Sequence, residues 1–458
     1  MRRSVLFAVA SIALGVASAA ADVVDDVRRL REQSLLLVGS DAKTILAQEW
    51  AKFDLRSLER RGQALRRVRA LGKRLADDQN AHRSRECSAQ IFLEAKWRAI
   101  YTADFETIER RIRDLEASLG NDNQAYVAQQ SPADGSWGVC FEPTFMKLEA
   151  TMFALQRLHR DNVVPRYTLN LLPEIRSGKD VVAFLAQLLV SDVAREGVDH
   201  RAELAALTIN SAQFQFKAYW QAYLEDQVEE LVRDRDRGGI TQIRADVRQF
   251  LDAWQDPVTG YWGAWYRVGD RLYRTTDLSI TFHLVSYLQG NVQHWPQIIE
   301  TTFKIANEPY PYGWRYGLSS NNHNNYDVVK IFRYGWPHMT EGQRARAREA
   351  MREMLSWALK HSLQPDGSFA PDESFFSSVA SDYYFGVSFF DEIGYWRASK
   401  RFWTDEAFAG AEADCLLIRR RFAELQLKSL LAPGAEQKLE AGCGAPWPHR
   451  QCVRRLGR

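Results

Sequence analysis

The sequence predicts an all-α fold, a ring of helical hairpins preceded by long N-terminal helices. Apolar residues recur three and four positions apart over residues 22–120, as amphipathic helices require. From about residue 140 onward, further helical stretches alternate with loops rich in Gly, Pro, Trp and Tyr. Alternating β-branched runs with hairpin turns are nearly absent, and one turn-like motif recurs along this second part of the chain.

The recurring motif places Gln, Pro, Gly, Trp and Gly at matching offsets in segments 130–138 and 255–263, and residues 364–369 form a shortened version. Proline cannot continue a helix, and glycine takes the left-handed geometry that a helix C-terminus favours, so the motif predicts helix-ending turns. Because the repeats lie more than one hundred residues apart, we interpret them as hairpins spaced around a ring. This arrangement resembles the α/α toroids, in which inner and outer helices alternate around a central cleft. Three coincidental Gly/Pro loops are the alternative.

Four segments follow from this interpretation. They are a signal peptide (1–21), long amphipathic helices packing on or extending from the toroid (22–120), an incomplete α/α toroid as catalytic domain (121–430) and a C-terminal tail (431–458). Arg2 and Arg3 precede an apolar run and then small residues before Asp22, which is typical of a secretory signal. The run is too short to span a membrane, and no later segment reaches about 20 apolar residues. We therefore expect a periplasmic or secreted protein without a membrane span.

Charge and cysteine content narrow the function classes. Removing the signal takes two arginines from 60 basic residues, which leaves 58 basic and 58 acidic residues and a formally neutral chain. Neutrality gives no support to binding of nucleic acid or of a membrane surface. Motifs for metalloproteases, nucleotide binding, serine hydrolases and zinc pairs are missing from the sequence, so no cofactor and no metal are expected. Cys443 and Cys452 flank a Gly/Pro segment, and in an oxidising compartment we predict a disulfide between them.

The segment Ser-Asn-Asn-His-Asn-Asn-Tyr-Asp at 320–327 carries the most distinctive chemistry. It follows an aromatic loop and precedes the apolar run 328–332, so we place it at a loop-to-helix junction. Amides beside an imidazole can neutralise a carboxylate and handle the proton on the adjacent carbon, which predicts sugar-acid chemistry. The alternative is that Asn321, Asn322 and Asn324 merely cap the helix and hold the turn.

The segment downstream strengthens the chemical interpretation. An Asp-Gly-Ser turn at 366–368 and then Asp382-Tyr383-Tyr384 follow the Asn-Asn-His element, an order shared with a known family. Over roughly residues 250–400 the chain resembles the alginate lyases of the Asn-Asn-His type, α/α toroids that cleave uronate polymers by β-elimination. The resemblance implies an exported lyase whose partner is an acidic, uronic-acid-containing polysaccharide or oligosaccharide.

The resemblance also implies residue roles. Asn322 would hydrogen-bond and neutralise the substrate carboxylate, His323 would act as base or position the sugar, and Tyr384 would be the phenolic base or acid. Tyr383 is an alternative to Tyr384, because adjacent helical residues point about 100° apart and only one of them can face the cleft. The chain departs from the family pattern in one respect: Phe375-Phe376-Ser377-Ser378 stands where the family has an arginine before the catalytic tyrosine. Either Arg315 or Arg333 substitutes from another helix, or the activity has been lost.

Sugar rings present apolar C–H faces on which aromatic side chains stack, although aromatic residues also build cores. The predicted substrate-binding residues are Asn321, Arg315, Arg333, Trp314, Tyr316, Trp262 and His283. For His283 and the nearby Asp277, a core histidine and a helix cap are the alternatives. Two other functions compete with the lyase: a non-catalytic exported sugar-binding or assembly protein, and a glycoside hydrolase with paired carboxylates. Candidate carboxylates for a hydrolase are Asp366, Asp372, Glu373, Asp391 and Glu392.

Overall fold

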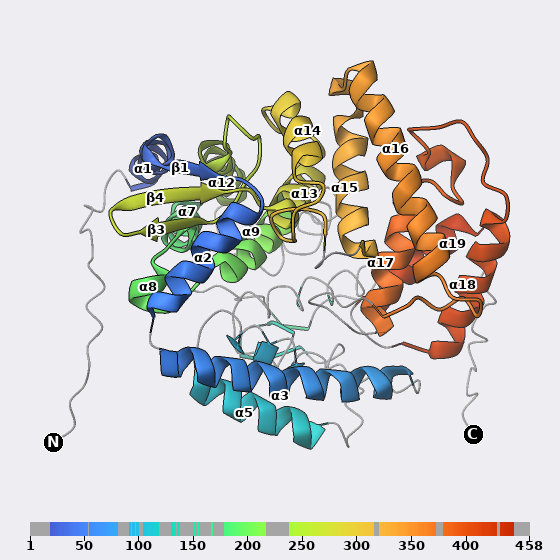
Figure 1. The fold of residues 1–458 in the computed structure, drawn as a ribbon, viewed down its shortest axis with the longest axis horizontal. Coiled ribbons are helices and arrows are strands. Elements are labelled where there is room, and N and C mark those ends of the chain that lie inside the picture. The colour runs from blue at the N-terminus through green and yellow to red at the C-terminus, as the bar shows by residue number, and fades with distance from the viewer. Residues whose placement is uncertain are drawn as a thin grey trace.

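The fold is that of a computed structural model, which describes most of the chain (Figure 1). The described residues are 19–53, 55–80, 91–118 and 130–137 with short gaps, a few positions between 151 and 167, 178–216, 238–315, 320–371, 379–427 and 431–443. These parts are mostly helical, as predicted, but they also contain a small mixed sheet. No helix within the described ranges is long and apolar enough to cross a bilayer.

The N-terminal helices pack onto the main core. They are α1 (Ala19–Gln33) and α2 (Ser40–Lys52). Helix α1 contacts α7 (Gly178–Leu189) and α12 (Gly238–Trp254), and its Val24 and Val27 are buried there. The predicted signal peptide includes the first three residues of α1. Because both buried valines follow the predicted cleavage point before Asp22, cleavage there would keep this packing.

Helices α3 (Leu55–Asn80) and α5 (Phe105–Ser118) form a second, separate core and lie side by side in Figure 1. Their buried residues recur at helical spacing, with Ala64, Val68, Leu71 and Leu75 on one helix and Ile108, Ile112 and Leu115 on the other. Between the helices, the Nη1 atom of Arg67 lies 2.6 and 2.8 Å from the two carboxylate oxygens of Glu109. This exposed pair lies on the outer face of the segment, whereas Arg61 and Arg111 are buried.

The sheet corrects the prediction of an all-α chain. Its strands are β1 (Leu35–Leu37), β2 (Val190–Ser191), β3 (Trp265–Val268) and β4 (Arg271–Thr275), in the order β1-β4-β3-β2. Strands β3 and β4 form an antiparallel hairpin, while β1 and β2 pair parallel to its two edges. Gly269 in the turn has φ 61°, a left-handed conformation that glycine adopts without strain. Gly269-Asp270 lies between two β-prone runs, which is a hairpin signal.

Among the described helices from α9 onward, every second one belongs to one continuous row. The row consists of α9 (Arg201–Phe216), α13 (Leu278–Tyr287), α15 (Asn322–Gly335), α17 (Val379–Glu392) and α19 (Ala432–Gly442). Each member packs against the next in this order. The intervening helices are α12, α14 (Trp295–Lys304), α16 (Glu341–Trp357) and α18 (Ala411–Leu425). Short helices complete the described chain: α8 (Val193–Glu196), η3 (Trp336–His338), η4 (Ala358–Ser362) and η5 (Ala398–Lys400).

Two neighbours in the row, α15 and α17, run parallel. The ring of Phe385 packs 4.3 Å from the ring of His323 near the start of α15, and Glu392 at the end of α17 binds Lys330 and Arg333 in the last turns of α15. At the other end of the row, Arg201 Nε bonds the carboxylate of Asp277 at 2.6 Å and joins the first residue of α9 to the N-cap of α13. The N-terminal ends of neighbouring row helices therefore lie together.

The recurring turn motif is structurally equivalent in its two full copies. In the first, Gln130 Nε2 donates to the carbonyl oxygens of Gly135 and Tyr167 at 2.8 and 2.7 Å. In the second, Gln255 Nε2 donates to the carbonyl oxygens of Gly260 and Gln293 at 2.8 and 2.9 Å. Gly135 and Gly260 both have positive φ, 69° and 72°. The same glutamine thus closes the turn and ties it to a segment 37 or 38 residues further along the chain.

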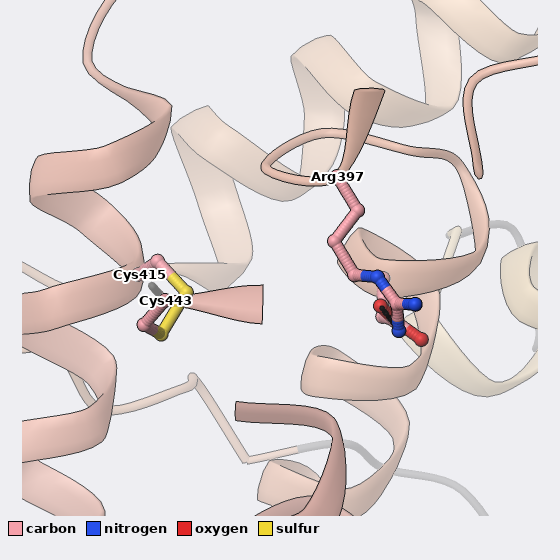
Figure 2. The surroundings of a disulfide bond; sticks show 4 residues. Arg397, Cys415 and Cys443 are labelled. Atoms are coloured by element: carbon pink, nitrogen blue, oxygen red, sulfur yellow. Dashed lines mark hydrogen bonds and ion pairs between the residues drawn. A yellow bond between two sulfur atoms is a disulfide. The ribbon is translucent and has the colours of Figure 1, made fainter. Parts of the chain in front are cut away.

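The predicted disulfide between Cys443 and Cys452 is wrong. Cys443 at the end of α19 bonds instead to Cys415 of α18, and Figure 2 shows this bridge with Arg397 on an adjacent segment. Helices α18 and α19 pack together and bring the two Cα atoms to 5.5 Å, a separation that a disulfide spans readily. Closeness in sequence suggested the other pair, and Cys452 lies outside the described residues.

Candidate functional site

The predicted loop-to-helix junction lies at the start of α15. Asn321 is the N-cap residue, with φ −146° and ψ 164°, and its Oδ1 accepts a hydrogen bond from the backbone N–H of Asn324 at 2.7 Å. Asn322, the first helical residue, donates from Nδ2 to Ser362 Oγ at 2.6 Å. Residues 321–325 are all buried, with at most 5% of their surface exposed. Helix capping therefore accounts for Asn321 Oδ1 but not for the other buried side-chain amides at this helix start.

Several amide atoms at this helix start have no hydrogen-bond partner among the described residues. They are the Nδ2 donors of Asn321 and Asn325 and the Oδ1 acceptor of Asn322. Leaving a buried polar group unpaired costs about 1–3 kcal/mol, so native proteins rarely do so without a reason. The N-terminus of α15 also carries the positive end of a helix dipole. Free amide donors and a helix N-terminus together suit an anionic group such as a carboxylate.

The imidazole of His323 is neutral, and its tautomer follows from the neighbouring amide. Asn324 Nδ2 donates to the carbonyl oxygen of Trp314 at 2.7 Å, so Asn324 Oδ1 faces His323 Nδ1 at 3.0 Å as an acceptor. Nδ1 must therefore carry the proton, and Nε2 is the acceptor nitrogen of the ring. Burial lowers the pKa of His323 to about 4, which keeps the ring uncharged at neutral pH. The rings of Tyr310 and Phe385 pack edge-on against the imidazole at 5.3 and 4.3 Å.

The carboxyl group of Asp327 lies close to the imidazole of His323. Asp327 Oδ2 is 4.0 Å from His323 Nε2, and both carboxyl oxygens of Asp327 lack a hydrogen-bond partner in the described part of the chain. Burial, and then the charge of Asp277, raise the pKa of Asp327 well above its usual value. Asp277 remains paired, because it accepts from Arg201 and from the backbone N–H of Ile280. Burial and the charge of Asp277 therefore both disfavour the ionised form of Asp327 beside a neutral imidazole.

The sequence predicted either a site or ordinary helix contacts for Asp277 and His283. Asp277 is the N-cap of α13, with its Oδ1 2.9 Å from the backbone nitrogen of Ile280. His283 Nδ1 lies 2.7 Å from the carbonyl oxygen of Ser279, one turn earlier in the same helix. The His283 ring also packs against Phe282 and Tyr287. Asp277 thus acts as a helix cap and His283 as a packed histidine, as the alternatives to a binding role predicted. Both residues lie next to the start of α15.

The two candidate tyrosines of α17 face different neighbours. Tyr383 is 1% exposed, donates its hydroxyl to the Gly367 carbonyl at 3.1 Å and packs against Phe369 and Phe422. Tyr384 is only partly buried, and Lys438 of α19 places its Nζ 4.4 Å from the Tyr384 ring centre. Gly434 lets α19 approach this closely, because a Cβ there would lie 2.7 Å from Tyr384 Cε2. Tyr384, rather than Tyr383, faces away from the turn that follows α16.

The two candidate arginines lie at opposite ends of α15. Arg315 Nη1 donates to Ser320 Oγ at 2.5 Å, immediately before the helix starts. Arg333 binds the Glu392 side chain and donates to the Lys400 carbonyl oxygen at 2.7 Å. Eleven residues separate Arg333 from Asn322, about 16 Å along a helix. Arg333 is therefore too far along α15 to serve its first turn, whereas Arg315 adjoins it.

The predicted stacking residues are placed as follows. Trp262 is 1% exposed and donates from Nε1 to the Leu251 carbonyl at 2.8 Å, so it packs back onto α12 as part of the repeated turn. Trp314 is 8% exposed and packs against Phe332, with its carbonyl oxygen accepting from Asn324. Tyr316 lies outside the described residues. The structure therefore places Trp262 in the core, and Trp314 beneath the start of α15.

The carboxylates considered for a hydrolase are mostly engaged in ion pairs. Asp391 binds Arg397 and Lys400, and Glu392 binds Lys330 and Arg333. Burial alone would raise the pKa of Glu392, but these cations outweigh burial and lower it to about 2. Asp366 is an exposed turn residue that accepts from Ser368, while Asp372 and Glu373 lie outside the described residues. Within the described ranges, no group of three or more His, Cys, Asp or Glu side chains could hold a metal ion.

Sequence reasoning missed three contributors to this region: Arg201, Tyr310 and Lys438. Each reaches the site from another helix or loop, so no spacing in the sequence marked it. Comparison of the chain with protein-family models, with curated proteins and with solved structures finds no match in any of the three. The similarity to alginate lyases of the Asn-Asn-His type therefore depends on the motif residues themselves.

Proposed function

We propose that the protein is an exported polysaccharide-lyase-like enzyme that cleaves a uronic-acid-containing polysaccharide by β-elimination, on an incomplete α/α toroid. One observation carries the proposal: buried amide donors without described partners lie at the start of α15, beside a neutral imidazole. β-Elimination requires donors that hold the substrate carboxylate and a base that removes the neighbouring proton. The start of α15 and the face of α17 offer both kinds of group.

The arrangement of the helices supports the toroid. Each row helix packs on the next while the intervening helices connect them, as an alternation of inner and outer helices requires. Parallel α15 and α17 fit this alternation, because successive inner helices of a toroid share one direction. The repeated turn with Gln130 and Gln255 adds an internal structural repeat. The small sheet would then lie beside the ring as an addition to it.

The substrate carboxylate fits the donors of α15. The two donors are the Nδ2 atoms of Asn321 and Asn325, four positions apart in the sequence. Only 5% and 3% of the surface of these two residues is exposed, so water competes weakly for the donors. As proton removal begins, negative charge spreads from the α carbon onto the carboxylate. Preorganised donors in a dry site stabilise this charge more strongly than water does. Arg315 adjoins the same helix start and adds positive charge.

We assign to Tyr384 the removal of the proton from the carbon next to the carboxylate. In the elimination, the C–H bond next to the carboxylate breaks, the C–O bond to the leaving sugar breaks, and a carbon–carbon double bond forms between the two carbons. The Tyr384 phenolate takes the proton and, now a phenol, returns it to the leaving oxygen, so the side chain ends in the state in which it began. His323 is neutral and well packed, which suits a positioning role beside the carboxylate better than a change of charge. A general base of this kind contributes typically 10²–10⁴-fold to the rate.

A non-catalytic uronate-binding protein is the second candidate. Burial favours it, because at most 5% of the surface of Asn322 and His323 is exposed. Such a protein would use the same amide donors to bind a carboxylate and would have no need of a base.

Mixing the protein with a panel of polyuronates, including alginate, tests the proposal. Elimination leaves an unsaturated uronate that absorbs near the ultraviolet edge, so absorbance should rise with time. Reducing ends that appear without this absorbance would instead identify a hydrolase. Carbohydrate binding with neither signal would identify the non-catalytic protein.

A further inference from the structure

The junction of α15, α17 and α19 is rich in cations, nearly all of which have a carboxylate partner. Lys330 and Arg333 bind Glu392, while Arg397 and Lys400 bind Asp391. Glu392 is 5% exposed in its side chain and Asp391 is 1% exposed. These pairs are therefore a closed, structural network that joins α15 to α17.

Lys438 is different. Its Nζ donates to Ser388 Oγ at 2.6 Å and lies 4.4 and 5.7 Å from the ring centres of Tyr384 and Tyr326. No carboxylate of the described residues forms a salt bridge with it. The residue as a whole is partly buried. A half-buried ammonium among aromatic rings, with one hydroxyl as its partner, has capacity for an anion.

We infer that Lys438 binds a substrate carboxylate beside Tyr384, as a second uronate position next to the donors of Asn321 and Asn325. The inference rests on the proposed function. Tyr326, whose ring centre is 5.7 Å from Lys438 Nζ, follows Asn321 by five residues and Asn325 by one, about 5 Å along α15 from the midpoint of these donors. A polyuronate carries one carboxylate on every sugar, so two anion-binding positions one helical turn apart suit neighbouring sugars.

Lys438 also supplies the positive charge that the sequence lacks before Tyr384. An ammonium over a phenol ring favours the phenolate, so Lys438 assists the proposed proton transfer in the pH range in which it is charged. The cation reaches Tyr384 from α19, at the close approach that Gly434 permits. An arginine in the residues preceding Tyr384 is then unnecessary.

The protonation of Lys438 gives the inference a measurable signature. Burial lowers the pKa of Lys438 to about 7; Lys330 and Lys400 lower it further, while Asp391 and Glu392 oppose them. Tyr384 and Tyr326 are the other titratable groups that face it. A carboxylate binds the ammonium and not the amine. Affinity should therefore fall about tenfold per pH unit above the pKa of the free protein.

The experiment is an NMR titration of the full chain with D-glucuronate from pH 6 to pH 9, with D-glucose as the uncharged control. Wild-type affinity for glucuronate should be constant below pH 7 and fall above it, while glucose shows no such dependence. Lys438→Arg keeps its charge throughout this range, so its affinity should not fall. Lys438→Met should lose the pH-dependent part of binding, whereas Lys360→Met, at an exposed lysine, should behave as wild type.

Wild-type affinity independent of pH, or an unchanged profile in Lys438→Arg, would overturn the inference. Its failure is separable from failure of the proposed function. Ultraviolet-absorbing product without pH-linked glucuronate binding would leave the lyase standing and remove Lys438 from its site. The opposite pattern would retain Lys438 as a uronate-binding residue in a protein without lyase activity.

Discussion

Replacing Glu392 by glutamine should destabilise the protein strongly at neutral pH. Glu392 is buried between α15 and α17 and interacts with Lys330, Arg333 and Lys400. Holding its pKa at about 2, against an ordinary 4.5, corresponds to about 3 kcal/mol of stability at pH 7. Because the folded-state pKa is the lower one, this contribution is complete above pH 4.5 and is lost as the pH falls through 2. At pH 3 roughly 1.5 kcal/mol should remain.

Urea denaturation of wild type and Glu392→Gln at pH 7 and pH 3 measures both values. Glu349→Gln is the matched control: Glu349 is 68% exposed and lies 3.7 Å from Arg352, so its loss should cost less than about 0.5 kcal/mol. A Glu392→Gln penalty below about 1 kcal/mol at pH 7 would refute the assignment of Glu392 as the charged link between the two helices. An equal penalty at both pH values would refute the electrostatic reasoning.

Further predictions concern the tyrosines and the disulfide. Tyr384→Phe should lower the elimination rate at least about 100-fold, whereas Tyr383→Phe should keep the rate and lose about 1 kcal/mol of stability with its hydrogen bond to a carbonyl; the reverse pattern would exchange their roles. Peptide mapping without reduction should find Cys415 joined to Cys443, and changing both to serine should cost about 3–4 kcal/mol for a separation of 28 residues. A fragment linking Cys443 to Cys452 would contradict this pairing.

Sequence periodicity predicted the helices well, because their apolar faces pack on neighbouring helices. The repeated turn was also readable, since Gln130 and Gln255 make the same hydrogen bonds in both copies. The sheet was missed because its strands are short and two of them pair with segments far away in the chain. Parallel pairing leaves no local pattern in β1 or β2, whereas the β3–β4 hairpin has a turn signal at Gly269-Asp270.

The candidate site was predicted in part. The sequence located Asn321 and His323 at a helix start, because the amide cluster precedes an apolar run. It could not choose between Tyr383 and Tyr384, because the choice depends on which helices surround α17. The sequence could not identify Lys438 as a site residue for the same reason. Its contact with Tyr384 joins α19 to α17, and the two residues are 54 positions apart in the sequence. The cysteine pairing likewise depends on helix packing.

The most direct test of the account is Asn321→Asp, assayed for ultraviolet-absorbing product on the polyuronate that wild type cleaves best. Aspartate keeps the oxygen that caps Asn324 and suits the helix N-terminus, so the thermal midpoint should not fall. It replaces the free Nδ2 donor by a negative oxygen that repels the substrate carboxylate. We expect the variant to fold and to lose at least about tenfold in elimination rate. A wild-type rate in this variant, or no product from wild type on any polyuronate, would contradict it.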